Sequence, residues 1–134
     1  MSSGVQDTIR VLHVDDEPGI LALTDEFLER EEESFNVIVA TDASEALDLI
    51  HDHNPDCVIS DFDMPGIDGH ELLQITRMQY PELPFIFFTS RDRETVIPDA
   101  VAVGITDYVE KEATPGQYEL LADRIRSVIQ AHRE

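Results

Sequence analysis

The chain has 134 residues, of which 29 are acidic and nine basic, and its formal net charge is −20 at pH 7. A surface this acidic repels nucleic acid and anionic membranes, so the composition argues against direct binding to either. The length suits one domain over 1–134. The sequence has no apolar stretch near ~18 residues, no signal-peptide pattern and a single cysteine, Cys57. We therefore expect a cytoplasmic protein without a membrane span or an internal disulfide.

Five short apolar runs, rich in Val, Ile and Phe, alternate with amphipathic stretches along the chain. We expect each run to be a strand, because parallel strands that are covered by helices on both faces are almost continuously apolar. The expected strands are residues 9–14, 37–40, 57–60, 85–88 and 105–109.

The stretches that follow these runs have the spacing and the start signals of helices. Asp42 and Glu45 form a capping-box pattern at the start of the second helix. The last helix is expected from Thr114, with Pro115 at its first helical position and Gln117 completing another capping box. The other expected helices cover about 18–30, 69–79 and 93–103.

Pro98 falls inside the fourth expected helix. A proline in a helix interior costs about 3 kcal/mol, because it removes one hydrogen bond and clashes with the preceding turn. We therefore expect this helix to start late, near Ile97 or Pro98, and residues 91–96 to be irregular.

Five strand–helix units with short connections predict an α/β fold, in which a doubly wound parallel sheet has helices on both faces. Such sheets place their ligand sites beyond the carboxyl ends of the strands. Polar residues follow the first, third and fourth predicted strands directly, and Lys111 lies two residues after the fifth. If the sheet is parallel, they all converge on one edge; they are Asp15, Asp16, Asp61, Asp63, Thr89, Ser90 and Lys111.

Carboxylates that meet at one edge repel each other. Two unit charges about 5 Å apart repel by roughly 3 kcal/mol at an effective dielectric constant of about 20. A Mg²⁺ ion relieves this repulsion, and it binds carboxylates, waters and phosphate oxygens. The acids at the strand ends therefore predict a Mg²⁺ site with room for phosphate, to which Asp63 would contribute its backbone carbonyl.

The same set of residues suits phosphoryl transfer to an aspartate. A carboxylate can act as a nucleophile and hold phosphate as an acyl phosphate. The three equatorial oxygens of the transferred group need cationic or hydrogen-bonding partners. Mg²⁺ would neutralise one oxygen, Lys111 a second, and the Thr89 hydroxyl with nearby backbone N–H groups the third.

Four segments resemble the receiver domains of response regulators, the CheY-like family of two-component signalling, over about residues 8–131. These segments are VLHVDDEP from Val11, SDFDMPGIDG from Ser60, FFTS from Phe87 and GITDYVEK from Gly104. The resemblance implies a flavodoxin-like receiver fold with the strand order 2-1-3-4-5. It also implies a signalling domain rather than an enzyme, one that catalyses only its own Mg²⁺-dependent phosphorylation and dephosphorylation.

The resemblance further implies roles for individual residues, with Asp61 as the phosphoacceptor. The implied metal ligands are Asp15, Asp16, Asp61 and the backbone carbonyl of Asp63. The implied phosphoryl contacts and switch residues are Thr89, Lys111 and Tyr108, although an aromatic residue on a strand is more often part of the core. The implied donor is a phosphohistidine of a histidine kinase. A downstream effector domain or protein would read the face made by the fourth helix, the fifth strand and the fifth helix.

Two features set this chain apart. Lys111 is its only lysine. An acidic surface almost free of lysine resembles the proteins of halophilic archaea. The alternative is an unusually acidic mesophilic domain. Receivers usually have a cis proline after this lysine, whereas Glu112 follows Lys111 here. A cis bond before a residue other than proline costs about 3–4 kcal/mol, so we expect either a trans bond or strain in this loop.

Three other functions remain open. Asp61-Phe62-Asp63 matches the Asp-x-Asp of haloacid-dehalogenase-type phosphatases, although the order of the acids along the chain is reversed and 134 residues leave no substrate cap. A flavodoxin-like FMN carrier shares the topology, but Asp15 and Asp16 would repel its phosphate. The third is a pseudo-receiver that binds proteins without being phosphorylated. The sequence also leaves open whether the domain stands alone or is a module of a larger chain.

Overall fold

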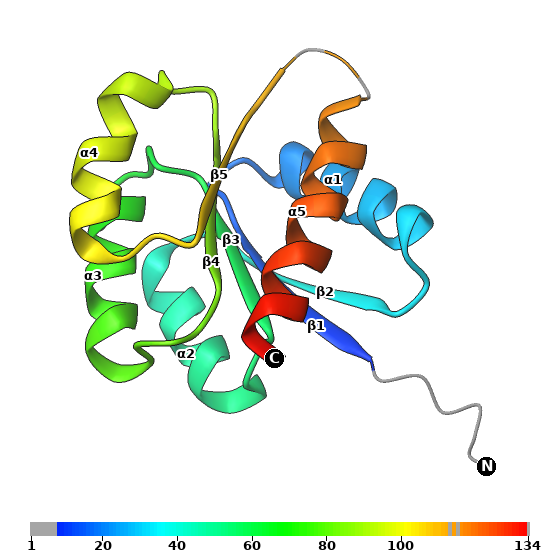
Figure 1. Cartoon of the computed structure of the whole chain (residues 1–134), viewed down its shortest axis with the longest axis horizontal. Coiled ribbons are helices and arrows are strands. Elements are labelled where there is room, and N and C mark those ends of the chain that lie inside the picture. The colour runs from blue at the N-terminus through cyan, green and yellow to red at the C-terminus, as the bar shows by residue number, and fades with distance from the viewer. Residues whose placement is uncertain (1–7, 113, 115, 134) are drawn as a thin grey trace.

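The structure is a computed structural model that describes residues 8–112, 114 and 116–133. In chain order its elements are β1 (Ile9–Val14), α1 (Pro18–Glu31), β2 (Phe35–Ala40), α2 (Ala43–His53), β3 (Cys57–Ser60), α3 (Gly69–Gln79), β4 (Phe85–Thr89), α4 (Arg93–Val103), β5 (Asp107–Glu110) and α5 (Gly116–Arg133). The strands form one parallel sheet in the order β2-β1-β3-β4-β5 (Figure 1). This confirms the predicted doubly wound α/β fold. None of the helices in the described ranges is long and apolar enough to cross a bilayer.

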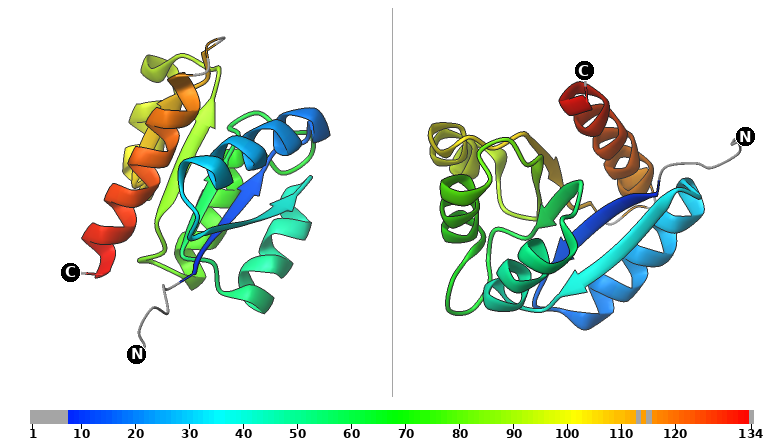
Figure 2. Two further views of the ribbon diagram at one scale, coloured as in Figure 1. Left: turned by 90° about the vertical axis from the view of Figure 1, so that its right-hand side faces the viewer. Right: turned by 90° about the horizontal axis from the view of Figure 1, so that it is seen from below.

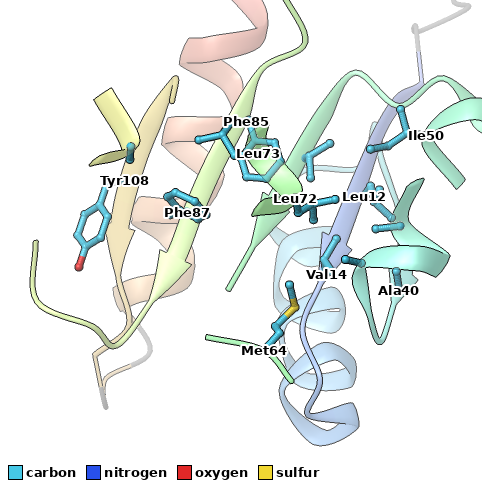
Figure 3. Close-up of a cluster of buried hydrophobic side chains, with 14 of the residues drawn as sticks. Leu12, Val14, Ala40, Ile50, Met64, Leu72, Leu73, Phe85, Phe87 and Tyr108 are labelled. Carbon is cyan, nitrogen blue, oxygen red and sulfur yellow. The ribbon is translucent and has the colours of Figure 1, made fainter. Parts of the chain in front are cut away.

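Helices cover both faces of the sheet, with α1 and α5 on one side and α2, α3 and α4 on the other (Figures 1 and 2). Successive strand side chains point to opposite faces, so each strand contributes to two cores. Leu12, Val14 and Phe87 belong to the core under α2, α3 and α4, part of which Figure 3 shows. Ile59 and Phe88 belong to the core under α1 and α5. Burial on both faces explains why the strands read as continuous apolar runs.

The start of α2 has the Asp42 half of the predicted capping box, while the return bond from Glu45 goes to the residue before the cap. The Asp42 carboxylate accepts a hydrogen bond from the Glu45 N–H at 2.8 Å. The Glu45 carboxylate reaches back to the N–H of Thr41 at 2.7 Å, one residue before the cap. The Glu45 N–H, which has no partner within the first turn of the helix, is thereby satisfied, and so is the N–H of Thr41 just outside the helix. At α5 the Gln117 N–H bonds to the Thr114 carbonyl, whereas the predicted role of Pro115 lies outside the described residues.

The prediction of a late start for α4 is wrong, because the helix is regular from Arg93 and contains Pro98. The N–H groups of Thr95 and Val96 both bond to the Asp92 carbonyl, which starts the helix ahead of the proline. Pro98 removes only the bond that its own N–H would make to the carbonyl of Glu94. Glu94 is exposed in the first turn, where water can hydrate that carbonyl, so the cost is smaller than in a buried helix interior.

The loop after β5 adopts the trans alternative. No peptide bond between described residues is cis, and this includes the bond from Lys111 to Glu112. The Glu112 N–H donates to the side-chain carbonyl of Gln117 at 2.8 Å, which ties the loop to the first turn of α5. The strand itself starts at Asp107, two residues later than predicted, because the Ile105 N–H still bonds to the Ala100 carbonyl at the end of α4.

Candidate functional site

Side chains from the ends of three strands meet at the carboxyl edge of the sheet. Asp15 directly follows β1, Asp61 directly follows β3 and Lys111 directly follows β5. The Lys111 ammonium reaches across β4 above the Phe88 ring, at 5.5 Å from its centroid. It donates to Asp15 Oδ2 at 2.8 Å and to Asp61 Oδ2 at 3.3 Å. The convergence predicted from the strand ends is therefore confirmed for these three residues.

Three carboxylates form the acidic half of this site. Asp15, Asp16 and Asp61 each present an oxygen atom such that the three atoms lie within 4.8 Å of one another. Asp15 is fully buried and its Oδ1 accepts the Glu17 N–H at 3.0 Å, which fixes the turn into α1. Asp16 is exposed, so the cluster opens to solvent on one side. An oxygen-only donor set of carboxylates with access for water fits Mg²⁺ better than it fits a metal that prefers nitrogen or sulfur.

Lys111 is held as a cation in this setting. Burial of its ammonium lowers the pKa, but the hydrogen bond to Asp15 and the negative charges of Asp61 and Asp15 outweigh burial. The net result is a pKa above the usual value of 10.5. Lys111 thus supplies one positive charge to two of the three clustered carboxylates, Asp15 and Asp61, and a divalent cation can compensate the remaining negative charge.

Close packing against α3 fixes the backbone at Asp61. The Gly69 N–H donates to the Phe62 carbonyl at 2.9 Å. A Cβ atom on Gly69 would lie 2.2 Å from the Asp61 carbonyl oxygen and 2.9 Å from the Phe62 Cα atom. Both are backbone atoms that cannot turn away, so only glycine allows the first turn of α3 to approach this closely. The start of α3 therefore sets the position of Asp61.

Thr89 and Asp63 lie beside this cluster. Thr89 is buried at the end of β4, and its carbonyl accepts the Lys111 N–H at 2.8 Å. Its hydroxyl oxygen accepts the N–H of Arg91 at 3.2 Å. The Asp63 N–H donates to Asp61 Oδ1 at 3.3 Å, but the Asp63 carboxylate turns toward Arg91. The backbone of Asp63 thus lies at the acidic cluster, whereas its side chain points away from the cluster toward Arg91.

Tyr108 is buried on β5, and its hydroxyl donates to the Arg91 carbonyl in the β4–α4 loop. Figure 3 shows this hydroxyl pointing away from the other labelled side chains of the core cluster. Burial of the hydroxyl raises the pKa of Tyr108, and the charges of Glu110 and Asp92 add to that rise. The ring of Tyr108 thus packs in the core, and its hydroxyl contacts the β4–α4 loop at the edge of the site.

Arg91 is a residue at this edge that the sequence does not single out, because it lies in the segment predicted to be irregular and belongs to no recognised motif. Its guanidinium donates to Asp63 Oδ2 at 3.0 Å and to Asp63 Oδ1 at 2.6 Å. It also lies over the Phe62 ring, at 5.1 Å from the centroid. One signal was available in the sequence: Arg91 follows Thr89 by two residues, as Asp63 follows Asp61, and β3 and β4 are neighbours.

Comparison with known proteins identifies the family. The sequence pattern described as the response regulator receiver domain matches residues 11–123. The chain belongs to the response regulator receiver family. A curated relative, response regulator Rre1 of Synechocystis sp. (strain ATCC 27184 / PCC 6803 / Kazusa), is 33% identical over 127 residues, which are 93% of this chain and 54% of that protein. This receiver therefore spans about half the length of that relative.

Solved receiver structures have the same fold. The receiver domain of the Francisella response regulator 1452 is 30% identical, with a TM-score of 0.79 over 92% of this chain and 98% of that one. Chemotaxis response regulator CheY4 of Vibrio cholerae is 28% identical, with a TM-score of 0.78 over 88% of this receiver and 98% of CheY4. A CheY-like receiver domain protein from Methanospirillum hungatei JF-1 has a TM-score of 0.84 at 24% identity, over 95% and 98% of the two chains. That last likeness supports the fold alone.

Proposed function

We propose that this receiver domain accepts a phosphoryl group on Asp61, in the cytoplasm, from a phosphohistidine of a histidine kinase and with the help of Mg²⁺. The observation that carries the proposal is the meeting of Asp61 with Asp15, Asp16 and the Lys111 ammonium at one edge of the sheet. An isolated aspartate would have neither the charge partners nor the metal ligands that phosphoryl transfer needs.

In the proposed reaction, a carboxylate oxygen of Asp61 forms a bond to phosphorus. The bond from phosphorus to the donor imidazole nitrogen breaks, and that nitrogen keeps the electron pair. Lys111 already donates to Asp61 Oδ2, so its ammonium would lie beside the incoming phosphoryl oxygens. The Thr89 hydroxyl accepts a bond from Arg91 and can donate its own hydrogen to a further phosphoryl oxygen. These residues supply charge and hydrogen bonds where negative charge is concentrated.

Mg²⁺ would be held by Asp15, Asp16, Asp61 and the backbone carbonyl of Asp63. When bound, the ion neutralises carboxylate and phosphoryl oxygens that otherwise repel each other. The clustering of three carboxylate oxygens within 4.8 Å supports this assignment, as does the Asp63 backbone, which lies beside Asp61. The chain's part is to keep these oxygens together in the presence of a single ammonium group.

The output of the domain would be a change in the face made by α4, β5 and α5. Thr89 and Tyr108 would be the switch residues, and both contact the backbone of Arg91 in the loop that leads into α4. A shift of this loop would change which conformation of the face is populated. A downstream effector domain or protein would read that face.

Two broader expectations belong to the same proposal. One is that residues 1–134 form a single receiver module, either alone or as part of a longer protein. The other is an origin in a halophilic archaeon, which the net charge of −20 and the presence of only one lysine support. High salt would screen the self-repulsion of such a surface.

The decisive test is labelling with acetyl phosphate in the presence and absence of Mg²⁺. Wild-type protein should incorporate one phosphoryl group, only with Mg²⁺, and the Asp61→Asn variant should incorporate none. Asp52→Asn is the matched control, because Asp52 is an exposed aspartate on α2 and should label like wild type. Incorporation at the same position in Asp61→Asn, measured by mass spectrometry of the intact protein and its peptides, would refute the proposal.

A further inference from the structure

Contacts from three different parts of the chain converge on Arg91. Its N–H donates to the Thr89 hydroxyl at 3.2 Å. Its carbonyl accepts the hydroxyl of Tyr108 on β5. Its guanidinium donates two hydrogen bonds, of 3.0 Å and 2.6 Å, to the carboxylate of Asp63 in the loop after β3. The main chain and the side chain of one residue thus connect Tyr108 with the loop that carries Asp61.

We propose that Arg91 is a positioning residue that couples the loop after Asp61 to Tyr108. While its guanidinium is paired with Asp63, its carbonyl is held where the Tyr108 hydroxyl donates. When the pair opens, the carbonyl moves and Tyr108 loses its partner. The biological use of this coupling rests on the proposed function, in which Asp61 is phosphorylated and Tyr108 belongs to the output face.

The contacts form a continuous path of four residues. The Asp63 N–H bonds to Asp61 Oδ1, the Asp63 carboxylate bonds to the Arg91 guanidinium, and the Arg91 carbonyl bonds to Tyr108. The guanidinium is a planar fork that matches both oxygens of a carboxylate, so the pair fixes orientation as well as distance. Phe62 supports the same group from one side, since the guanidinium carbon lies 5.1 Å from its ring centroid. The side chain of Arg91 therefore has one preferred position.

The pair is also open to competition. The side chains of Arg91 and Asp63 are 42% and 54% exposed, and ion pairs at such positions contribute little and are screened by salt. A phosphoryl group on Asp61 would add acceptor oxygens with more negative charge than the Asp63 carboxylate carries. The guanidinium would then divide its time between Asp63 and the phosphoryl group. The Arg91–Asp63 ion pair can therefore open and close, and its opening is the step that changes the contact between Arg91 and Tyr108.

Fluorine NMR of protein labelled with 3-fluorotyrosine tests the coupling in the unphosphorylated, metal-free state. The chain has three tyrosines, so Tyr108→Phe assigns one resonance and leaves Tyr80 and Tyr118 as internal references. Asp63→Asn and Arg91→Gln should each shift the Tyr108 resonance. The double variant should show the same shift as the single variants, because both changes open one pair. The Tyr80 and Tyr118 resonances should stay in place.

Arg30→Gln is the matched control, because Arg30 and Glu26 form an exposed ion pair on α1 and this change should leave the Tyr108 resonance unmoved. If Arg91→Gln does not fold, Arg91→Lys, which keeps the charge and loses the planar fork, takes its place. An unmoved Tyr108 resonance in both single variants would overturn the coupling, and so would a double-variant shift equal to the sum of the two. Failure of wild-type labelling by acetyl phosphate would refute the proposed function while leaving this result intact, because no phosphoryl group takes part in the NMR test.

Discussion

The ion pair of Lys111 with Asp15 and that of Arg91 with Asp63 both lie at the carboxyl edge of the sheet, and they differ in burial and in the elements that carry them. Lys111 comes from the end of a strand, its side chain is 16% exposed, and its partner Asp15 is fully buried. Arg91 comes from a loop, and it and its partner Asp63 are 42% and 54% exposed. Burial removes the water that would otherwise solvate the first pair, so removal of either member leaves a buried charge unpaired at a high cost in free energy. In the second pair, water can replace either member. We call Asp15, Asp61 and Lys111 the centre of this edge, whose side chains are held in place, and we call Arg91 and Asp63 its rim, whose side chains can move.

The largest difference between the two pairs should appear on removal of the cation. Lys111→Met leaves buried Asp15 without its compensating charge, and we expect the free energy of unfolding to fall by about 3 kcal/mol when divalent cations are absent. Arg91→Gln should leave the urea unfolding midpoint within experimental error. Equal losses of stability in the two variants would abolish the distinction between centre and rim. Partial recovery of Lys111→Met on addition of Mg²⁺ would sharpen it.

The backbone of the centre can be tested at Gly69. Gly69→Ala places a Cβ atom 2.2 Å from the Asp61 carbonyl oxygen, so α3 or the Asp61 backbone must move. We expect a loss of about 2 kcal/mol in urea unfolding, as is usual for overpacked sites, together with slower phosphoryl labelling. Gly19→Ala is the matched control, because nothing lies within 4 Å of a Cβ atom there and alanine favours the helix. A fully stable Gly69→Ala with normal labelling would show that the backbone at Asp61 is not fixed.

A smaller effect is expected at alkaline pH. The pKa of Lys111 is raised in the folded state, so the stability that its charge contributes is fully present below the usual value of 10.5. That contribution is lost as the pH rises through the higher folded value. The loss of stability between pH 10 and pH 12, followed by circular dichroism, should therefore be larger in wild type than in Lys111→Met. Ionisation of Tyr108, whose pKa is also raised, destabilises both proteins equally and cancels in the comparison. An identical decline in the two proteins would contradict the raised pKa of Lys111.

The sequence was sufficient to predict that the residues of the centre meet, but it was not sufficient to predict the pair at the rim. The reason lies in the elements that carry each group. Asp15, Asp61 and Lys111 meet because parallel strands end at a common edge, and strands covered on both faces are easy to recognise as apolar runs. Their convergence therefore follows from topology. Arg91 and Asp63 meet because two loops adopt particular conformations, and no periodic pattern in the sequence encodes a loop conformation.

The error at Pro98 has a related cause. The rule that proline breaks helices describes the loss of one hydrogen bond, and its cost depends on whether the freed carbonyl can reach water. That carbonyl belongs to Glu94, in the exposed first turn of α4, while Val96 and Ala100 bury the same helix against the core. Packing therefore outweighed local propensity. The late start of β5 has a local cause instead, since the Ile105 N–H donates to the Ala100 carbonyl and this bond extends the end of α4.

The two hydrogen bonds of the Lys111 ammonium span 96 and 50 residues of the chain. No short fragment contains all three participants. The ammonium reaches the two carboxylates only when β1 and β3 are neighbours in the sheet and β5 has paired with β4 on the far side of β3. The complete group of charges at this edge therefore exists only in the assembled sheet. A chain in which one of these strands fails to pair would lack a member of this group of charges, and it could not carry out the proposed phosphoryl transfer.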